Sequence, residues 1–93
     1  MPLFPDSDQT ESDIIRAMTN FAGKRALEVG CGDGRLLRHY AGLVGAAVGL
    51  DPDPDEVAFA RSELPAARFV LGEAQTLPFP DQSFDLVVFA WSL

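Results

Sequence analysis

Short apolar runs alternate along this chain with stretches in which apolar residues recur every three or four positions. Four of the runs are typical of buried strands, and they cover residues 26–29, 46–51, 67–71 and 84–91. Apolar residues recur at helical spacing before and between these runs, which predicts helices at residues 10–23, 34–44 and 52–64. Strands that alternate with helices predict an α/β fold, built on a parallel sheet with right-handed crossovers.

The residue types at the ends of these stretches support the predicted helices. Thr10 and Asp13 have the spacing of a capping box, which pairs side chains with backbone amides at a helix start. Gly23 and Gly45 stand where helices commonly end. Prolines and acids at residues 52–56 suit the first turn of another helix, because the amides of that turn have no partners within the helix.

Three glycines stand at alternate positions between the first strand and the helix predicted after it. Gly30, Gly32 and Gly34 permit a sharp turn, and their missing Cβ atoms let a ligand approach the main chain. Unpaired amides at the start of the next helix suit a carboxylate or a phosphate. A P-loop is disfavoured because Arg35 stands where that motif has lysine. The third glycine also comes one residue too early for a dinucleotide motif.

An acid ends or follows each of the first three predicted strands. The carboxyl ends of parallel strands share one edge of the sheet, so Glu28, Asp51 and Glu73 are expected to face one crevice. Glu28 would repel a pyrophosphate and could pair with an ammonium group. Asp51 lies 21 residues beyond Gly30, an offset that suits hydrogen bonds from the two hydroxyls of a ribose. Asp51 also precedes Pro52, where an aspartate is a common helix N-cap.

Overall charge and composition exclude several classes of partner. Acids outnumber bases 14 to 7, and a net charge of −7 argues against nucleic acid and anionic membranes as partners. No signal-peptide pattern opens the chain, and no apolar run approaches the ~20 residues of a membrane span, so we expect a cytoplasmic protein. Cys31 is the single cysteine, which excludes an internal disulfide. Cys31 and the single histidine, His39, are interpreted as structural residues, and no metal site is predicted.

Together these features resemble the class I S-adenosylmethionine-dependent methyltransferases, most closely the small-molecule branch that includes enzymes of quinone biosynthesis. The resemblance rests on three segments, Leu27–Gly34, Gly49–Asp51 and Gly72–Asp85, and runs from about residue 24 to the end. It implies a Rossmann-like parallel sheet, here truncated to about four strands in the order 3-2-1-4 with flanking helices. We expect residues 1–23 to form a lead-in and helix, and residues 24–93 to form a partial S-adenosylmethionine-binding domain.

The resemblance implies roles for two groups of residues. At the methionine end, Glu28 would lie near the amino group of the cofactor, and the Phe89–Ala90 region would line the same end. The glycine loop would pass under the methionine portion, with contacts from Gly30, Cys31, Gly32 and Gly34. No catalytic base is identified.

At the adenosine end, the resemblance implies that Asp51 binds the ribose hydroxyls and that Pro52 lies close to the adenine. Glu73 would accept a hydrogen bond from the adenine amino group, and the backbone of Ala74 would donate one to the ring. Glu73 departs by one methylene from the aspartate that the family usually has here.

Three functions remain open on the sequence alone. The first is the cofactor-binding part of a methyltransferase that acts on a small-molecule acceptor. The second is a nonenzymatic module that works by pairing with another chain, and the third is a fragment of an NAD-dependent oxidoreductase. Because the family has further strands beyond the fourth, we expect little methyl transfer by these 93 residues alone. We also expect self-association through an exposed fourth strand.

Overall fold

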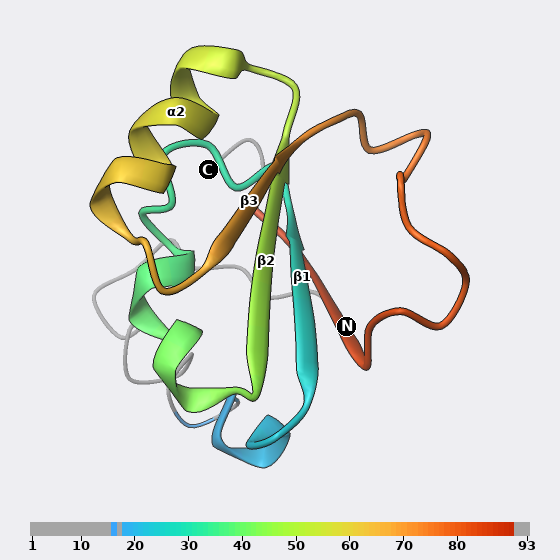
Figure 1. Ribbon diagram of the computed structural model, residues 1–93. Coiled ribbons are helices and arrows are strands. Elements are labelled where there is room, and N and C mark those ends of the chain that lie inside the picture. Colours follow the sequence, from blue (N-terminus) through green and yellow to red (C-terminus); the bar gives the residue numbers. More distant parts are fainter. Residues whose placement is uncertain (1–15, 17, 91–93) are drawn as a thin grey trace.

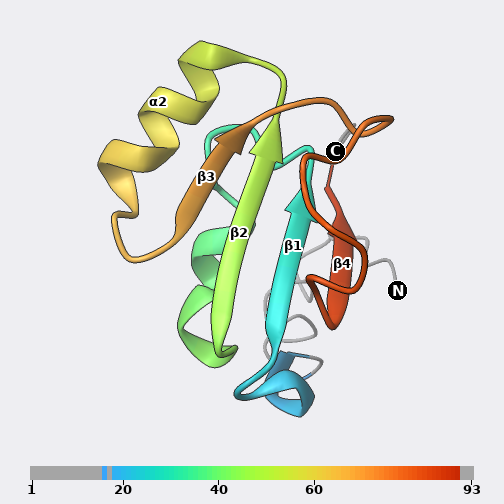
Figure 2. The same ribbon diagram turned by 45° about the vertical axis from the view of Figure 1, so that its right-hand side comes forward.

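A computed structural model describes residue 16 and residues 18–90, and its centre is a four-stranded parallel sheet. The strands lie in the order β3-β2-β1-β4, and Figures 1 and 2 show them side by side. Their bounds are Arg25–Val29 for β1, Ala46–Asp51 for β2, Arg68–Leu71 for β3 and Leu86–Phe89 for β4. The predicted α/β fold and its strand order are therefore confirmed.

Helical segments cover one face of the sheet and a long loop covers the other (Figure 1). The covering helix is α2, Pro54–Glu63, and three short 3-10 helices accompany it at Thr19–Phe21, Leu37–His39 and Ala41–Leu43. Residues 72–85 run across the opposite face in front of β1 and β4 (Figure 2). Within the described residues, no helix has the length and apolarity needed to cross a membrane.

The helix predicted at residues 34–44 is wrong, because the chain forms two separate 3-10 turns there. Tyr40 stands between the two turns with φ −126° and ψ −4°, outside helical geometry. Gly42 further lowers the helix propensity of the segment. The predicted apolar spacing nevertheless buries Leu36, Leu37 and Val44 together with Tyr40, so periodicity identified the inward face of a segment that is not an α-helix.

The boundaries of other elements also differ from the prediction. Asp53, and not Asp51, caps α2: its Oδ1 accepts hydrogen bonds from Asp55 N at 2.9 Å and Glu56 N at 3.4 Å. The last strand is shorter than predicted and ends at Phe89. The capping box at residues 10–13 and the strand end beyond residue 90 lie outside the described residues.

Two apolar layers hold the sheet, one on each face. Toward α2, the core contains Ala26, Leu37, Tyr40, Val57, Phe69 and Val88. On the other face, Leu27, Val29, Val48 and Leu50 pack against Phe79 and Phe84 of the long loop. The rings of Phe79 and Phe84 meet edge to face, with centroids 5.0 Å apart. The loop therefore takes the place of a helical layer in the described structure.

A pair of charged residues fixes β4 beside β1. The backbone amide of Arg25 donates to Asp85 Oδ2 at 2.8 Å, and the Arg25 guanidinium bonds the same carboxylate. These contacts hold the pKa of Asp85 below its ordinary value. In return, Asp85 N donates to Arg25 O at 2.8 Å. The strand registers Leu27↔Val87 and Val29↔Phe89 continue from this contact.

Position 49 on β2 has no room for a side chain, because Cys31 and Phe69 fill the space beside it. An alanine Cβ there would lie 2.8 Å from both Cys31 Sγ and Phe69 Cδ1. We expect Gly49→Ala to lower the free energy of unfolding by about 1–3 kcal/mol, measured by urea denaturation. Gly42→Ala is the control, because its Cβ would meet nothing within 4 Å. Equal stability of the two variants would contradict this packing role.

Candidate functional site

The glycine loop leaves β1 and crosses over the end of β2. Gly30, Gly32 and Gly34 have φ values of 78°, 55° and 86°, a region that side chains disfavour. The amides of Gly30 and Cys31 both donate to the Leu50 carbonyl, at 2.7 and 3.1 Å. The predicted sharp turn is therefore present, although the segment after it is not an α-helix.

Asp51 ties this loop to the segment that leads into α2. Its Oδ2 accepts a hydrogen bond from Gly32 N at 2.9 Å, and its Oδ1 accepts one from Asp53 N at 2.9 Å. Each carboxylate oxygen has a second acceptor position. Asp51 thus holds the main chain in place and still has lone pairs for a ligand.

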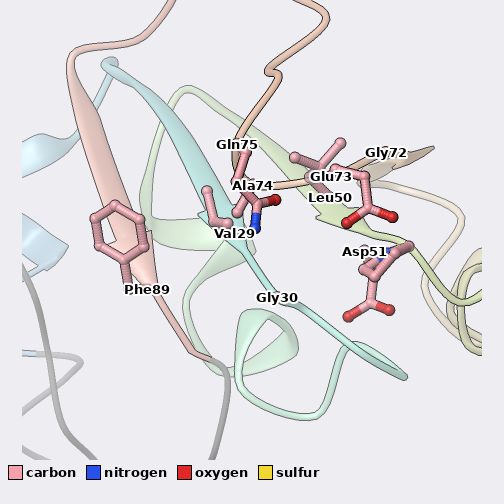
Figure 3. Close-up of a pocket in the computed structure, with 10 residues that line it drawn as sticks. Val29, Gly30, Leu50, Asp51, Gly72, Glu73, Ala74, Gln75 and Phe89 are labelled. Atoms are coloured by element: carbon pink, nitrogen blue, oxygen red, sulfur yellow. The ribbon is translucent and has the colours of Figure 1, made fainter.

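A cavity of about 630 Å³ opens over the carboxyl ends of β1 and β2. This volume lies within the range of small-molecule sites. Of the residues predicted to bind a cofactor, those that line it are Gly30, Asp51, Pro52, Glu73, Ala74 and Phe89. Figure 3 shows the Asp51 and Glu73 carboxylates on one side of this cavity and the Phe89 ring on the other. The remaining lining is Val29, Leu50, Gly72 and Gln75.

A second cavity, of about 320 Å³, lies against the glycine loop and shares Gly30 and Asp51 with the first. The other predicted residues that line it are Glu28, Cys31, Gly32 and Ala90. Asp33, Arg35, Leu36 and Glu56 complete the lining. The two cavities therefore bring together every predicted site residue except Gly34, which is absent from both linings.

Gly34 is favoured by its backbone conformation, because its φ of 86° lies in a region that side chains disfavour. A Cβ at this position would lie 3.4 Å from Phe69 Cζ and 3.5 Å from the Ala60 Cβ, which are ordinary contact distances. The loop therefore lies against α2 and β3 here, and the turn rather than the space calls for glycine.

Glu28 is the one buried charged residue in the described part of the chain, with 1% of its surface exposed. Its Oε1 accepts a hydrogen bond of 2.6 Å from the Tyr40 hydroxyl. Its Oε2 has no hydrogen-bond partner among the described residues. Burial raises the Glu28 pKa to about 7, and the Tyr40 hydrogen bond opposes that rise.

Cys31 has the character of a packing residue. Its thiol is buried, and its pKa is raised to about 12 by burial and then by the charges of Glu28 and Asp51. A thiol that stays protonated at neutral pH is a poor nucleophile. Within the described residues, no group of three or more metal-ligating side chains comes together.

Several residues around the site were not predicted, and three of them carry a polar side chain that matters here: Tyr40, Glu56 and Gln75. The apolar spacing at residues 34–44 includes Tyr40, but a tyrosine at helical spacing gives no sign of where its hydroxyl points. Glu56 was assigned only to a helix start, and Gln75 was given no role, yet both line the cavities. Gln75 lies two residues after Glu73, and this spacing could have indicated that it also lines the cavity.

Comparison with protein families matches residues 27–93 to a family described as "Methyltransferase domain". Among curated relatives, the fatty-acid O-methyltransferase of Mycolicibacterium smegmatis is 42% identical over 76 residues, covering 77% of this chain and 28% of that protein. The demethylmenaquinone methyltransferase of Geobacillus kaustophilus is 34% identical over 89 residues, covering 87% of this chain and 38% of that protein. The chain thus spans only 28% and 38% of the length of these two relatives.

Solved structures share the fold. The YcgJ protein of Bacillus subtilis superposes with a TM-score of 0.77 at 30% identity, covering 85% of this chain and 36% of that one. CalS10 of Micromonospora echinaspora, described as a SAM-bound amino pentose methyltransferase, superposes with a TM-score of 0.70 at 35% identity. That match covers 86% of this chain and 33% of CalS10. These matches cover most of the present chain, and the resemblance stated from the sequence is confirmed.

Burial of Glu28 predicts a measurable dependence of stability on pH. The folded chain holds the Glu28 proton up to about pH 7, whereas the carboxyl has an ordinary pKa of 4.5. The folded state therefore binds more protons between these values, and the contribution of Glu28 to the free energy of unfolding falls as pH rises through this window. We expect Glu28→Gln to be more stable than the parent at pH 8 by on the order of 1–3 kcal/mol.

The measurement is urea denaturation at pH 4.5 and pH 8, and the advantage of Glu28→Gln should be absent at the lower pH. Glu63→Gln makes the same chemical change at an exposed position of α2 and serves as the control. A parent chain that is more stable than Glu28→Gln at pH 8 would contradict the assignment of a destabilising buried carboxylate.

Proposed function

The chain belongs to the methyltransferase domain family, and we propose that it binds S-adenosylmethionine across its two joined cavities for methyl transfer to a small-molecule acceptor. The observation that carries the proposal is the meeting of the cavities at Gly30 and Asp51. The larger has a nucleoside-sized volume with acids on one wall. The smaller is lined by Glu28, whose buried Oε2 has no partner among the described residues.

The larger cavity suits the adenosine part of the cofactor. Asp51 has acceptor positions for the ribose hydroxyls, and Pro52 stands beside it at the rim. The side chains of Val29 and Leu50 supply apolar surface for the adenine ring. Glu73 and Ala74 follow β3 and line the same cavity. The Glu73 carboxylate and the Ala74 amide can pair with the polar edge of the adenine ring.

The smaller cavity suits the methionine part. An ammonium group within reach of Glu28 would supply the partner that its Oε2 lacks. Gly30 and Gly32 carry no side chain to block the approach of the ligand to the loop, and Cys31 fills the space beneath it. Phe89 is the last residue of β4 and lines the larger cavity, whereas Ala90 follows it and lines the smaller one.

A bound sulfonium supplies an already activated methyl group, so the protein contributes mainly alignment. Backbone amides of the glycine loop donate to the Leu50 carbonyl and to the Asp51 carboxylate, and these bonds keep the loop's shape before a ligand arrives. A loop held in this way loses little further freedom on binding, and orientation is a large part of such catalysis.

The charge of the site disfavours the NAD-dependent alternative. Four acids line the smaller cavity, Glu28, Asp33, Asp51 and Glu56, against one base, Arg35. A pyrophosphate placed there would meet mainly like charge, whereas a ligand with a sulfonium and an ammonium group would meet opposite charge.

Other sequence predictions join this proposal. We propose a small-molecule methyl acceptor, because several named relatives act on small molecules, and a cytoplasmic location. The absence of nucleic-acid and membrane partners stays a prediction from the net charge of −7. The division at residues 23 and 24 also stays a prediction.

Asp51 gives the most direct test of cofactor binding. We expect Asp51→Ala to weaken binding of S-adenosylhomocysteine by on the order of 2–3 kcal/mol in calorimetry, because hydrogen bonds to a charged acceptor are lost. Asp81→Ala is the matched control, since Asp81 lies in the exposed long loop and lines neither cavity. Asp51→Asn retains a carbonyl acceptor for Gly32 and should fold if the alanine variant does not.

Unchanged affinity in both Asp51 variants would remove this residue from the site. A parallel titration with NAD is expected to give no heat, because of the acidic lining. Binding of NAD but not of S-adenosylhomocysteine would overturn the proposed function.

Self-association is a separate prediction that arises from β4. This strand is an edge of the described sheet, and 42% of the Phe89 surface is exposed. Edge strands with apolar side chains tend to pair with another chain. We expect the sedimentation coefficient of the 93-residue chain to rise with concentration. Phe89→Lys should reduce that rise, and a parent chain that stays monomeric at all concentrations would contradict the prediction.

A further inference from the structure

The Glu28–Tyr40 pair joins the central strand to a segment 12 residues further along the chain. Glu28 lies on the central strand β1, and Tyr40 lies between the two 3-10 turns that follow the glycine loop. Each side chain has 1% of its surface exposed. The hydroxyl of Tyr40 lies 2.6 Å from Glu28 Oε1. The pair is therefore a short buried hydrogen bond within an otherwise apolar core layer.

The hydrogen bond uses only one of the two carboxylate oxygens. Glu28 Oε2 is buried and has no partner among the described residues, although Glu28 lines the smaller cavity. A buried polar atom without a partner costs free energy, so a purely structural pair would be expected to satisfy both oxygens. The arrangement fixes one oxygen and leaves the other for a ligand.

We propose that Tyr40 is a positioning residue: its hydroxyl orients Glu28 and favours the charged carboxylate, so that Oε2 receives the ammonium group of the cofactor. This inference rests on the proposed function. It assigns a role to a residue that contacts neither cavity and that acts through Glu28.

The surroundings of Glu28 explain why a donor is needed. On β2 the facing residue is Gly49, with Asp51 at the strand end, and on β4 it is Val88. Around the same cavity, the loop carries Cys31, Asp33 and Arg35, and α2 carries Glu56. Apart from Arg35, these ionisable groups are acids or a thiol, which disfavour a second negative charge. Tyr40 donates the hydrogen bond that favours the carboxylate.

The proposal has a consequence for the pH dependence of ligand binding. The parent pKa of about 7 for Glu28 means that an ammonium ligand should bind more tightly as pH rises through neutrality. Loss of the Tyr40 hydroxyl removes the influence that lowers this pKa, so the binding curve should move to higher pH. For each pH unit by which the curve moves, the affinity at pH values below the Glu28 pKa should fall about tenfold. The affinity well above that pKa should stay nearly unchanged.

The test compares the parent chain with Tyr40→Phe, which removes the hydroxyl and keeps the ring. Affinity for S-adenosylhomocysteine is measured by calorimetry between about pH 6 and 8.5. The curve of affinity against pH should lie at higher pH in the variant than in the parent. Ser83→Ala is the control, because it removes a hydroxyl that is hydrogen-bonded at 2.6 Å within the long loop. Glu28→Gln should bind weakly with little dependence on pH.

A second measurement needs no ligand. Carbon-13 NMR of the glutamate carboxyls follows the Glu28 titration directly, with its signal assigned by its loss in Glu28→Gln. The Glu28 midpoint should move upward in Tyr40→Phe and stay in place in Ser83→Ala. Equal midpoints in the parent and Tyr40→Phe would overturn the inference.

The two outcomes separate this inference from the proposed function. If the parent chain does not bind S-adenosylhomocysteine at any pH, the proposed function fails, and with it the role assigned to Tyr40. If the parent binds but its pH profile is unchanged in Tyr40→Phe, only the positioning role fails. If Tyr40→Phe does not fold, the single tyrosine of the chain can be replaced by 3-fluorotyrosine, whose hydroxyl is a stronger donor. The Glu28 midpoint should then move downward, and an unchanged midpoint would overturn the inference.

Discussion

The hydrogen bonds between the glycine loop and the end of β2 determine the shape of the whole site. Leu50 O accepts from the amides of Gly30 and Cys31, and Asp51 accepts from Gly32. With the loop held in this way, Gly30 and Asp51 line both cavities. Glycine is needed in the loop because the backbone there takes positive φ values. Glycine is needed at position 49 because a Cβ there would collide with the Cys31 side chain.

Stability and binding make opposite demands on Glu28. A leucine or glutamine at this position would avoid the cost of placing a carboxylate in the core. The chain keeps the acid and partly compensates for it with the Tyr40 hydroxyl. Such a local cost is expected where a site must be ready for a charged ligand, because the ligand then supplies the missing interaction.

Much of this structure could be predicted from local pattern. Continuous apolar runs are typical of strands buried on both faces, so β1, β2 and β4 were recognisable. Acids at the ends of β1, β2 and β3 marked the crevice. The segment after Gly34 could not be predicted, because apolar spacing is similar in an α-helix and in successive 3-10 turns. The choice of Asp53 over Asp51 as helix cap depended on a tertiary contact, the bond from Gly32 N to Asp51. The Tyr40–Glu28 bond is likewise a product of tertiary packing.

The central claim is that one ligand occupies both cavities, and amide NMR with isotope-labelled protein tests it most directly. On addition of S-adenosylhomocysteine, the amide signals of Gly30, Gly32 and Ala74 should shift together with one affinity. The signals of Gln82 and Phe84, which line a separate hollow on the long loop, should stay in place. Shifts confined to residues 77–84, or no shifts at a saturating concentration, would contradict the claim.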